Sequence, residues 1–184
     1  VMIPFYLILT VARSHNIEYL NGIFEMKNAS MPIFVSQPYI YIANNYDNFN
    51  FLVGALPGHS FGLKGLFPLW ALSGLKFFFP QLINFPIYVD KTELTTLTLF
   101  YDSYYDFGWI GVLLFSCILG AIAYILVVKL REMRNPLGYL LYAQFAAYLM
   151  LSFFTTWFSN TTTWFYLILT GIMALFYHLR ASRW

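Results

Sequence analysis

The chain has 184 residues, of which 60% are hydrophobic and only 10% are charged, with 20 phenylalanines and 15 tyrosines. Soluble domains carry about 25% charged residues. This composition therefore predicts an integral membrane protein and excludes a water-soluble one, because too little charge remains to cover a core. The formal net charge of +2 says little as a total, so its distribution along the chain is the useful signal.

Residues 1–12 form an apolar run that stops at Arg13 and is too short to cross a bilayer. The run lacks the basic start and small-residue cleavage site of a signal peptide. We interpret it as the end of a membrane span whose beginning lies outside this sequence, and a short interfacial helix is the alternative. The chain is then the C-terminal part of a longer polytopic protein.

Residues 13–106 are apolar but repeatedly interrupted by Asn, Pro, Gly and charged residues, so they contain no clean span. Irregular backbone at membrane depth must be satisfied by protein or by a water-filled cavity. We therefore expect an ordered external loop with short amphipathic or re-entrant helices. Within it, residues 63–79 are long enough to span, but Lys64, Lys76 and Pro68 favour an interfacial helix with snorkelling lysines. A true span at 63–79 is the alternative.

Three membrane-spanning helices are predicted at residues 107–128, 139–158 and 161–179. The first contains no Asp, Glu, Lys, Arg or His and reaches roughly 33 Å as a helix, enough for a bilayer core of roughly 30 Å. Trp157 and Trp164 flank the polar bend 159–163, as in an interfacial aromatic belt. The predicted fold class is an all-α polytopic membrane protein with three spans and a partial N-terminal one.

Basic residues predict the orientation, because short loops rich in them stay in the cytoplasm. The bend 159–163 carries none of them. The turn after the first span and the C-terminal tail together carry five: Lys129, Arg131, Arg134, Arg180 and Arg183. We therefore expect a multi-pass protein of the cytoplasmic membrane with a cytoplasmic C-terminus. Residues 13–106 then lie outside.

Four carboxylates and three tyrosines precede the first span: Asp90, Glu93, Asp102, Asp106, Tyr101, Tyr104 and Tyr105. A carboxylate can act as general base toward a hydroxyl, and aromatic rings stack on the apolar faces of sugars, so the group suits carbohydrate chemistry. Alternatively, Asp102 and Asp106 stabilise the helix N-terminus, with Asp106 as its N-cap. For that reason Asp102 is the preferred base.

Arg13 and His15 stand where the first apolar run meets the external segment. A guanidinium binds pyrophosphate bidentately and a histidine takes a proton near neutral pH, so the pair suits a lipid diphosphate, with membrane anchoring as the alternative for Arg13. His59 is either a further substrate contact or an ordinary loop histidine. Metal and nucleotide motifs are absent, so we expect no metal, no cofactor and no nucleic-acid partner.

Two stretches carry a family resemblance: residues 38–49 (PYIYIANNYDNF) and residues 101–111 (YDSYYDFGWIG), the second leading into a glycine-containing span. With them, roughly residues 13–130 resemble the C-terminal half of bacterial oligosaccharide repeat-unit polymerases, the Wzy-type enzymes of O-antigen, capsule and exopolysaccharide biosynthesis. The resemblance implies metal-independent glycosyl transfer at the outer face of the cytoplasmic membrane. A glycan on undecaprenyl diphosphate is passed to the terminal sugar hydroxyl of another lipid-linked unit.

For such a reaction the candidate catalytic residues are four acidic residues and one histidine: Asp102, Asp106, Asp90, Glu93 and His15. The candidate substrate-binding residues are Arg13, His59, Lys64, Tyr101, Tyr104 and Tyr105. The expected partners are the lipid-linked oligosaccharide, membrane lipid, and a chain-length regulator and a flippase. Alternatives from other classes are a transporter or flippase of lipid-linked saccharides, and a structural membrane subunit without chemistry. None of the eight carboxylates lies in a predicted span, which does not favour ion-coupled transport.

Overall fold

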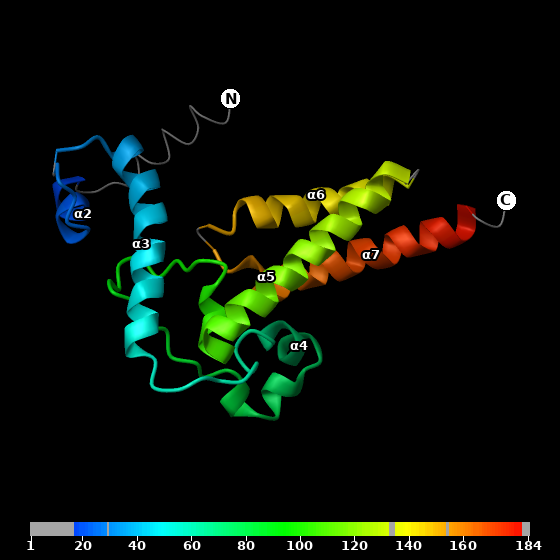
Figure 1. The fold of residues 1–184 in the computed structure, drawn as a ribbon, viewed down its shortest axis with the longest axis horizontal. Helices are drawn as coiled ribbons and strands as arrows, with labels where there is room; N and C mark the ends of the chain where they lie inside the picture. Colours follow the sequence, from blue (N-terminus) through cyan, green and yellow to red (C-terminus); the bar gives the residue numbers. More distant parts are fainter. Residues whose placement is uncertain (1–16, 29, 133–134, 154, 182–184) are drawn as a thin grey trace.

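The computed structural model describes residues 17–28, 30–132, 135–153 and 155–181, which are helical and contain no strand. Its α-helices are α2 (Ile17–Ile23), α3 (Ile33–Ala55), α4 (Phe67–Leu72), α5 (Tyr101–Glu132), α6 (Pro136–Met150) and α7 (Thr161–Ala181). Short 3₁₀ turns lie at Leu75–Phe77, Pro80–Leu82 and Trp157–Ser159. As Figure 1 shows, α5, α6 and α7 form an elongated bundle, and α3 runs across one end of it. The all-α prediction is confirmed.

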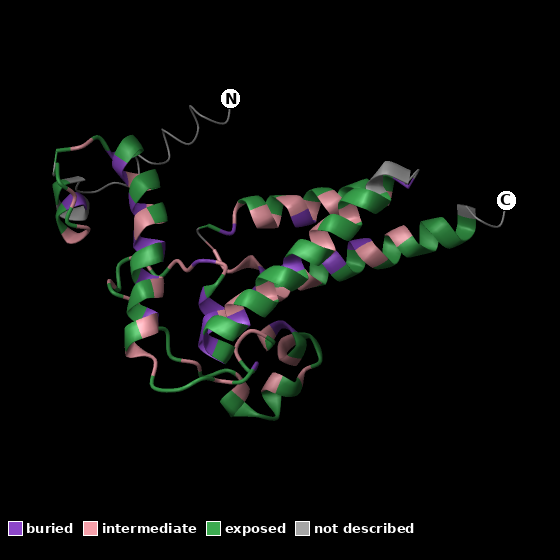
Figure 2. Cartoon of the chain, viewed as in Figure 1, coloured by how far each residue is buried: buried purple, intermediate pink, exposed green. Residues whose placement is uncertain are grey.

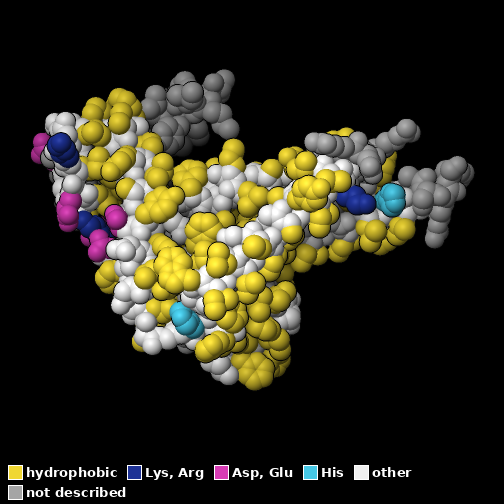
Figure 3. Space-filling model, viewed as in Figure 1, with side chains coloured by type: hydrophobic (Ala, Val, Ile, Leu, Met, Phe, Trp, Pro, Cys, Tyr) yellow, Lys and Arg dark blue, Asp and Glu magenta, His cyan; other side chains and the backbone are white. Residues whose placement is uncertain are grey.

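Two helices of the bundle are long and apolar enough to cross a membrane, over Tyr101–Lys129 and Thr161–Arg180. Only 11% of the most apolar window of each is buried, whereas the core helix of a soluble protein hides most of its apolar side chains. Exposed residues therefore dominate α5 and α7 in Figure 2, and hydrophobic side chains cover much of the bundle in Figure 3. An apolar surface of this kind is compatible with a lipid environment.

The middle helix of the bundle ends earlier than the sequence predicts. Helix α6 has 15 residues and is about 22 Å long, less than a bilayer core. It stops at Met150 because the next residues bind neighbouring segments instead of continuing the helix. The Ser152 carbonyl accepts the Leu99 N–H at 3.0 Å, and the Phe153 carbonyl accepts the Asn45 amide at 3.3 Å. The predicted helix 139–158 is thus wrong for the described residues after Met150.

Helix α3 is longer than the short helices expected in this region, with 23 residues. The middle of its buried face is polar. Asn44 and Asn48 donate to the Leu94 carbonyl at 2.9 and 3.1 Å, and Asn48 also donates to the Thr96 carbonyl at 3.0 Å. Asn48 accepts the Asp90 N–H at 3.0 Å. These side chains pair with backbone C=O and N–H groups of an irregular segment, which would otherwise lack partners. The asparagines that interrupt the hydropathy pattern thus hold residues 88–97 against α3.

Residues 63–79 form no continuous helix, so the structure contains no straight span there. Helix α4 has six residues, and Gly74, with a φ of 77°, turns the chain into the following 3₁₀ turn. Phe77 and Phe78 are each 78% exposed, and the Lys76 ammonium lies 5.9 and 5.1 Å from the ring centres of Phe67 and Phe77. The segment is short, apolar and exposed, as an interfacial segment with a snorkelling lysine is expected to be.

Candidate functional site

The candidate site forms where residues 57–65 fold onto the first turns of α5. Helix α5 is broken at Gly108, whose φ of 61° and ψ of −147° are not helical and favour glycine. The break removes the helical donors that the preceding carbonyls would otherwise have. The Tyr105 carbonyl accepts the Ser60 N–H at 3.2 Å, and the Asp106 carbonyl accepts the Phe61 N–H at 3.0 Å. The break in the helix thus leaves two carbonyl groups free to bind the loop.

The Asp106 carboxylate fastens the same loop through its side chain. It is 3% exposed and accepts the backbone N–H of Lys64 at 3.1 Å, the N–H of Gly65 at 2.7 Å and the Ser60 hydroxyl. A Cβ atom at Gly65 would lie 2.6 Å from Asp106 Oδ2, so only glycine permits this approach. Asp106 therefore binds the loop before α4, and the interpretation of it as the N-cap of its own helix is corrected.

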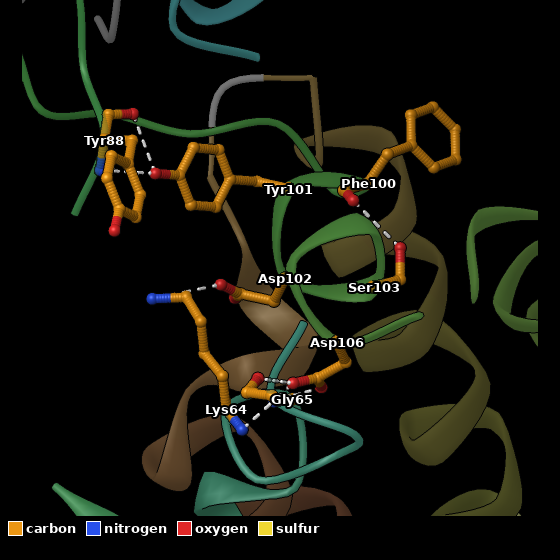
Figure 4. A network of polar contacts seen from close by, with 9 residues as sticks. Lys64, Gly65, Tyr88, Phe100, Tyr101, Asp102, Ser103 and Asp106 are labelled. Carbon is orange, nitrogen blue, oxygen red and sulfur yellow. Dashed lines mark hydrogen bonds and ion pairs between the residues drawn. The ribbon is translucent and has the colours of Figure 1, made fainter. Parts of the chain in front are cut away.

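Asp102, one turn earlier, makes a different set of contacts. Its Oδ1 lies 3.5 Å from the Lys64 ammonium, with the two side chains 7% and 12% exposed; Figure 4 shows the pair beside the Asp106 contacts. The Ser159 hydroxyl, from the 3₁₀ turn before α7, also interacts with this carboxylate. Burial disfavours both charges, and each stabilises the other. Asp102 is thus held by side chains that can move, whereas Asp106 is held mainly by backbone.

Tyr101 and Tyr105 of α5 lie beside the Lys64 ammonium, and Tyr104 belongs to the same hydrophobic core. Tyr101, Tyr104 and Tyr105 are 0%, 8% and 5% exposed. The Tyr101 hydroxyl donates to the Tyr88 carbonyl and accepts the Tyr88 N–H, both at 2.7 Å, while the Tyr104 ring contacts that of Trp109 at 5.1 Å. The Lys64 ammonium lies 4.7 and 5.6 Å from the ring centres of Tyr105 and Tyr101. These rings pack the core around the ion pair, and they present no open face for a sugar to stack on.

The other predicted site residues lie apart from this pair or outside the description. Asp90 lines a separate pocket against α3, and Glu93 is exposed on the irregular segment. His59 is exposed, with its Nδ1 3.3 Å from the Tyr105 carbonyl oxygen, at the rim of the docked loop. Arg13 and His15 lie outside the described residues. The four carboxylates therefore do not form one cluster, although they are close in sequence.

Sequence reasoning missed three residues of the site: Ser60, Gly65 and Ser159. A signal for the first two was present, since PGHSFGLKG at 57–65 places small residues around one lysine, as a loop that closely approaches another backbone requires. Nothing in the sequence pointed to Ser159. Among the described residues, no group of three or more His, Cys, Asp or Glu side chains is arranged to hold a metal ion.

The site lies at one particular end of the bundle. It contains the start of α5 and the turn before α7, whereas the basic residues Lys129 and Arg180 lie near the ends of α5 and α7. In Figure 3 charged groups gather at both ends of the molecule, with hydrophobic side chains between them. The ion pair is thus at the end remote from the basic turn.

Comparisons of the chain with protein families, curated proteins and solved structures gave no match. A functional assignment consequently depends on the chain's own residues and their geometry.

Proposed function

We propose that this chain belongs to a membrane glycosyltransferase that polymerises undecaprenyl-diphosphate-linked oligosaccharide repeat units for a surface polysaccharide. The observation that carries the proposal is the buried Lys64–Asp102 pair, 3.5 Å apart, which lies beside the rings of Tyr101 and Tyr105 at the end of the bundle remote from Lys129 and Arg180. A cation and a carboxylate in one water-poor site supply what the reaction needs: a partner for a diphosphate and a base for a hydroxyl.

In the proposed topology the bundle crosses the cytoplasmic membrane with the site on the outer side. Helices α5 and α7 are the two apolar spans, and α6 makes the third crossing together with the segment after it, whose described residues 151–153 and 155–156 are irregular. The contacts of Ser152 and Phe153 satisfy backbone in that irregular part, as membrane depth demands. The positive-inside rule places the Lys129 end and the C-terminus in the cytoplasm.

In the proposed mechanism the donor's diphosphate competes for the Lys64 ammonium and thereby releases the Asp102 carboxylate. The acceptor hydroxyl oxygen then bonds to the donor's anomeric carbon while the bond from that carbon to the diphosphate oxygen breaks. Asp102 takes the hydroxyl proton, and undecaprenyl diphosphate leaves with the bonding electrons. The Ser159 hydroxyl, which interacts with the Asp102 carboxylate, orients it. Lys64 stabilises the leaving charge, an electrostatic role that a dry site strengthens.

The test is the Asp102→Asn variant in cells that lack the native gene, with polymer length read at matched protein level. The amide keeps the shape of the side chain but not its basicity, and general-base assistance is typically worth about 10² to 10⁴ in rate. We expect single repeat units on the cell surface and no long polymer. The control Glu18→Gln changes an exposed carboxylate on α2 and should keep the wild-type length distribution.

The double variant Lys64→Met/Asp102→Asn separates chemistry from folding. Removing both charges avoids the unpaired buried charge that a single removal leaves, so this protein should insert and accumulate normally but not polymerise. Wild-type polymer length from Asp102→Asn would refute the assigned role of Asp102. Lipid-linked units retained on the cytoplasmic side would instead indicate a transporter or flippase.

A further inference from the structure

A pocket separate from the ion pair lies between α3, the turn after α2 and the segment that begins at Asp90. Its volume is about 320 Å³, at the lower end of the range of about 300 to 1,000 Å³ for small-molecule sites. Its lining combines aromatic rings with carboxylates, chiefly Phe24, Tyr39, Phe51, Glu25, Asp47 and Asp90. None of these side chains belongs to the Lys64–Asp102 site.

Interactions between distant segments hold the walls of this pocket in place. Lys91 joins them, because its ammonium lies 3.1 Å from the Glu25 carboxylate and donates to the Ile23 carbonyl. The Asp90 N–H donates to Asn48 of α3 at 3.0 Å. The shape of the pocket is therefore formed before any ligand arrives, which lowers the entropic cost of binding.

The electrostatics of the pocket favour a ligand rich in hydroxyl or amino groups. The lining contains three carboxylates, from Glu25, Asp47 and Asp90, and one ammonium, from Lys91, which is paired with Glu25. Carboxylates accept hydrogen bonds from hydroxyl and ammonium groups and repel other anions. Within the described residues no metal-binding group of His, Cys, Asp and Glu occurs, so the geometry of these acids does not match a cation site.

Two aromatic side chains of the pocket are exposed, whereas the tyrosines near the ion pair are buried. Tyr39 and Phe51 are 59% and 41% exposed, whereas Tyr101 is 0% exposed. They belong to one helix and are separated by twelve residues, or about 18 Å along its axis. Exposed rings beside hydrogen-bond acceptors match the alternating apolar faces and polar edges of sugars. The separation of the rings exceeds one sugar, so it fits an oligosaccharide.

We propose that this pocket binds an oligosaccharide without negative charge, stacked on Tyr39 and hydrogen-bonded to the carboxylates of Asp47 and Asp90. Its assignment as the acceptor glycan rests on the proposed polymerase function. The pocket selects neutral or amino sugars and rejects uronic acids, because an anionic sugar meets three carboxylates. It holds the acceptor unit at a place separate from the ion pair, where the terminal hydroxyl of that unit reacts.

The experiment measures binding of soluble sugars to the purified protein in detergent by saturation-transfer NMR. The probes are maltotriose and chitotriose, with trigalacturonate as the anionic counterpart. We expect saturable binding of at least one neutral probe and none of trigalacturonate. Tyr39→Ala and Asp47→Ala should each weaken binding about tenfold, the equivalent of losing one good stacking or charge-assisted contact.

The matched control is Tyr46→Ala, since Tyr46 lies on the same helix, is 57% exposed and does not line the pocket. It should bind the probe like the wild type. No binding of either neutral probe, or equal weakening by Tyr46→Ala and Tyr39→Ala, would overturn the proposal. Asp102→Asn should keep sugar binding while losing polymer, so failure of the pocket and failure of the polymerase function give different results.

Discussion

Asp106 provides the most direct test of how the site is assembled. Its carboxylate accepts three hydrogen bonds from the loop, two of them from backbone N–H groups at 3.1 and 2.7 Å. Asp106→Asn replaces one acceptor oxygen by an NH₂ group, which cannot accept a bond. If the remaining oxygen faces Lys64 and Ser60, the NH₂ group is directed at the Gly65 N–H, so two donors meet. The loop should then loosen from α5.

The magnitude follows from the bonds that are lost. A hydrogen bond to a charged group contributes about 1.5 to 3 kcal/mol, and a buried N–H left without a partner costs a similar amount. Because Asp106 is only 3% exposed, water does not replace the missing partner. We therefore expect Asp106→Asn to destabilise the protein by about 1.5 to 3 kcal/mol. At about 2 to 4 °C per kcal/mol for a chain of this size, the unfolding midpoint falls by about 3 to 12 °C.

The assay is thermal unfolding of the purified protein in detergent, combined with limited proteolysis within residues 57–65. The variant should unfold earlier and be cut faster in this loop, while Asp47→Asn, an exposed change on α3, should match the wild type in both. An unchanged midpoint together with unchanged protection of the loop would refute the anchoring role. Such a result would mean that the contacts of Asp106 contribute no net stability.

Two further predictions concern the close approach at the loop and the topology. Gly65→Ala should also lower the unfolding midpoint, because the new Cβ atom would lie 2.6 Å from Asp106 Oδ2. The control Gly120→Ala, whose Cβ would have no atom within 4 Å, should leave the midpoint unchanged. Equal midpoints of the two variants would contradict the structure. In a background without Cys117, cysteine at exposed Asn160 should react with an impermeant thiol reagent in intact cells, and cysteine at exposed Lys129 should not. The reverse labelling pattern would overturn the orientation.

The sequence was informative where a property depends on neighbouring residues along the chain. The apolar runs within α5 and α7 and the polar bend between α6 and α7 were predicted, because hydropathy and length alone decide whether a helix suits a bilayer. The choice of Asp102 and Asp106 before the first span as candidate residues also followed from local pattern. Their different contacts did not, because both precede the span and are one turn apart.

Only the tertiary structure decided which polar groups form hydrogen bonds and ion pairs with each other. Asn48 looked like an interruption, yet it bonds to backbone 46 and 48 residues away and so belongs to a long helix.

The end of α6 at Met150 has the same kind of cause, since the next residues bond to Leu99 and Asn45. The N–H of Lys64 reaches Asp106 across 42 residues, and the ammonium of Lys64 reaches Asp102. Within a weakly polar interior a buried donor or acceptor without a partner is costly, so most of them are paired. That partner is set by the three-dimensional path of the chain, which local periodicity does not encode.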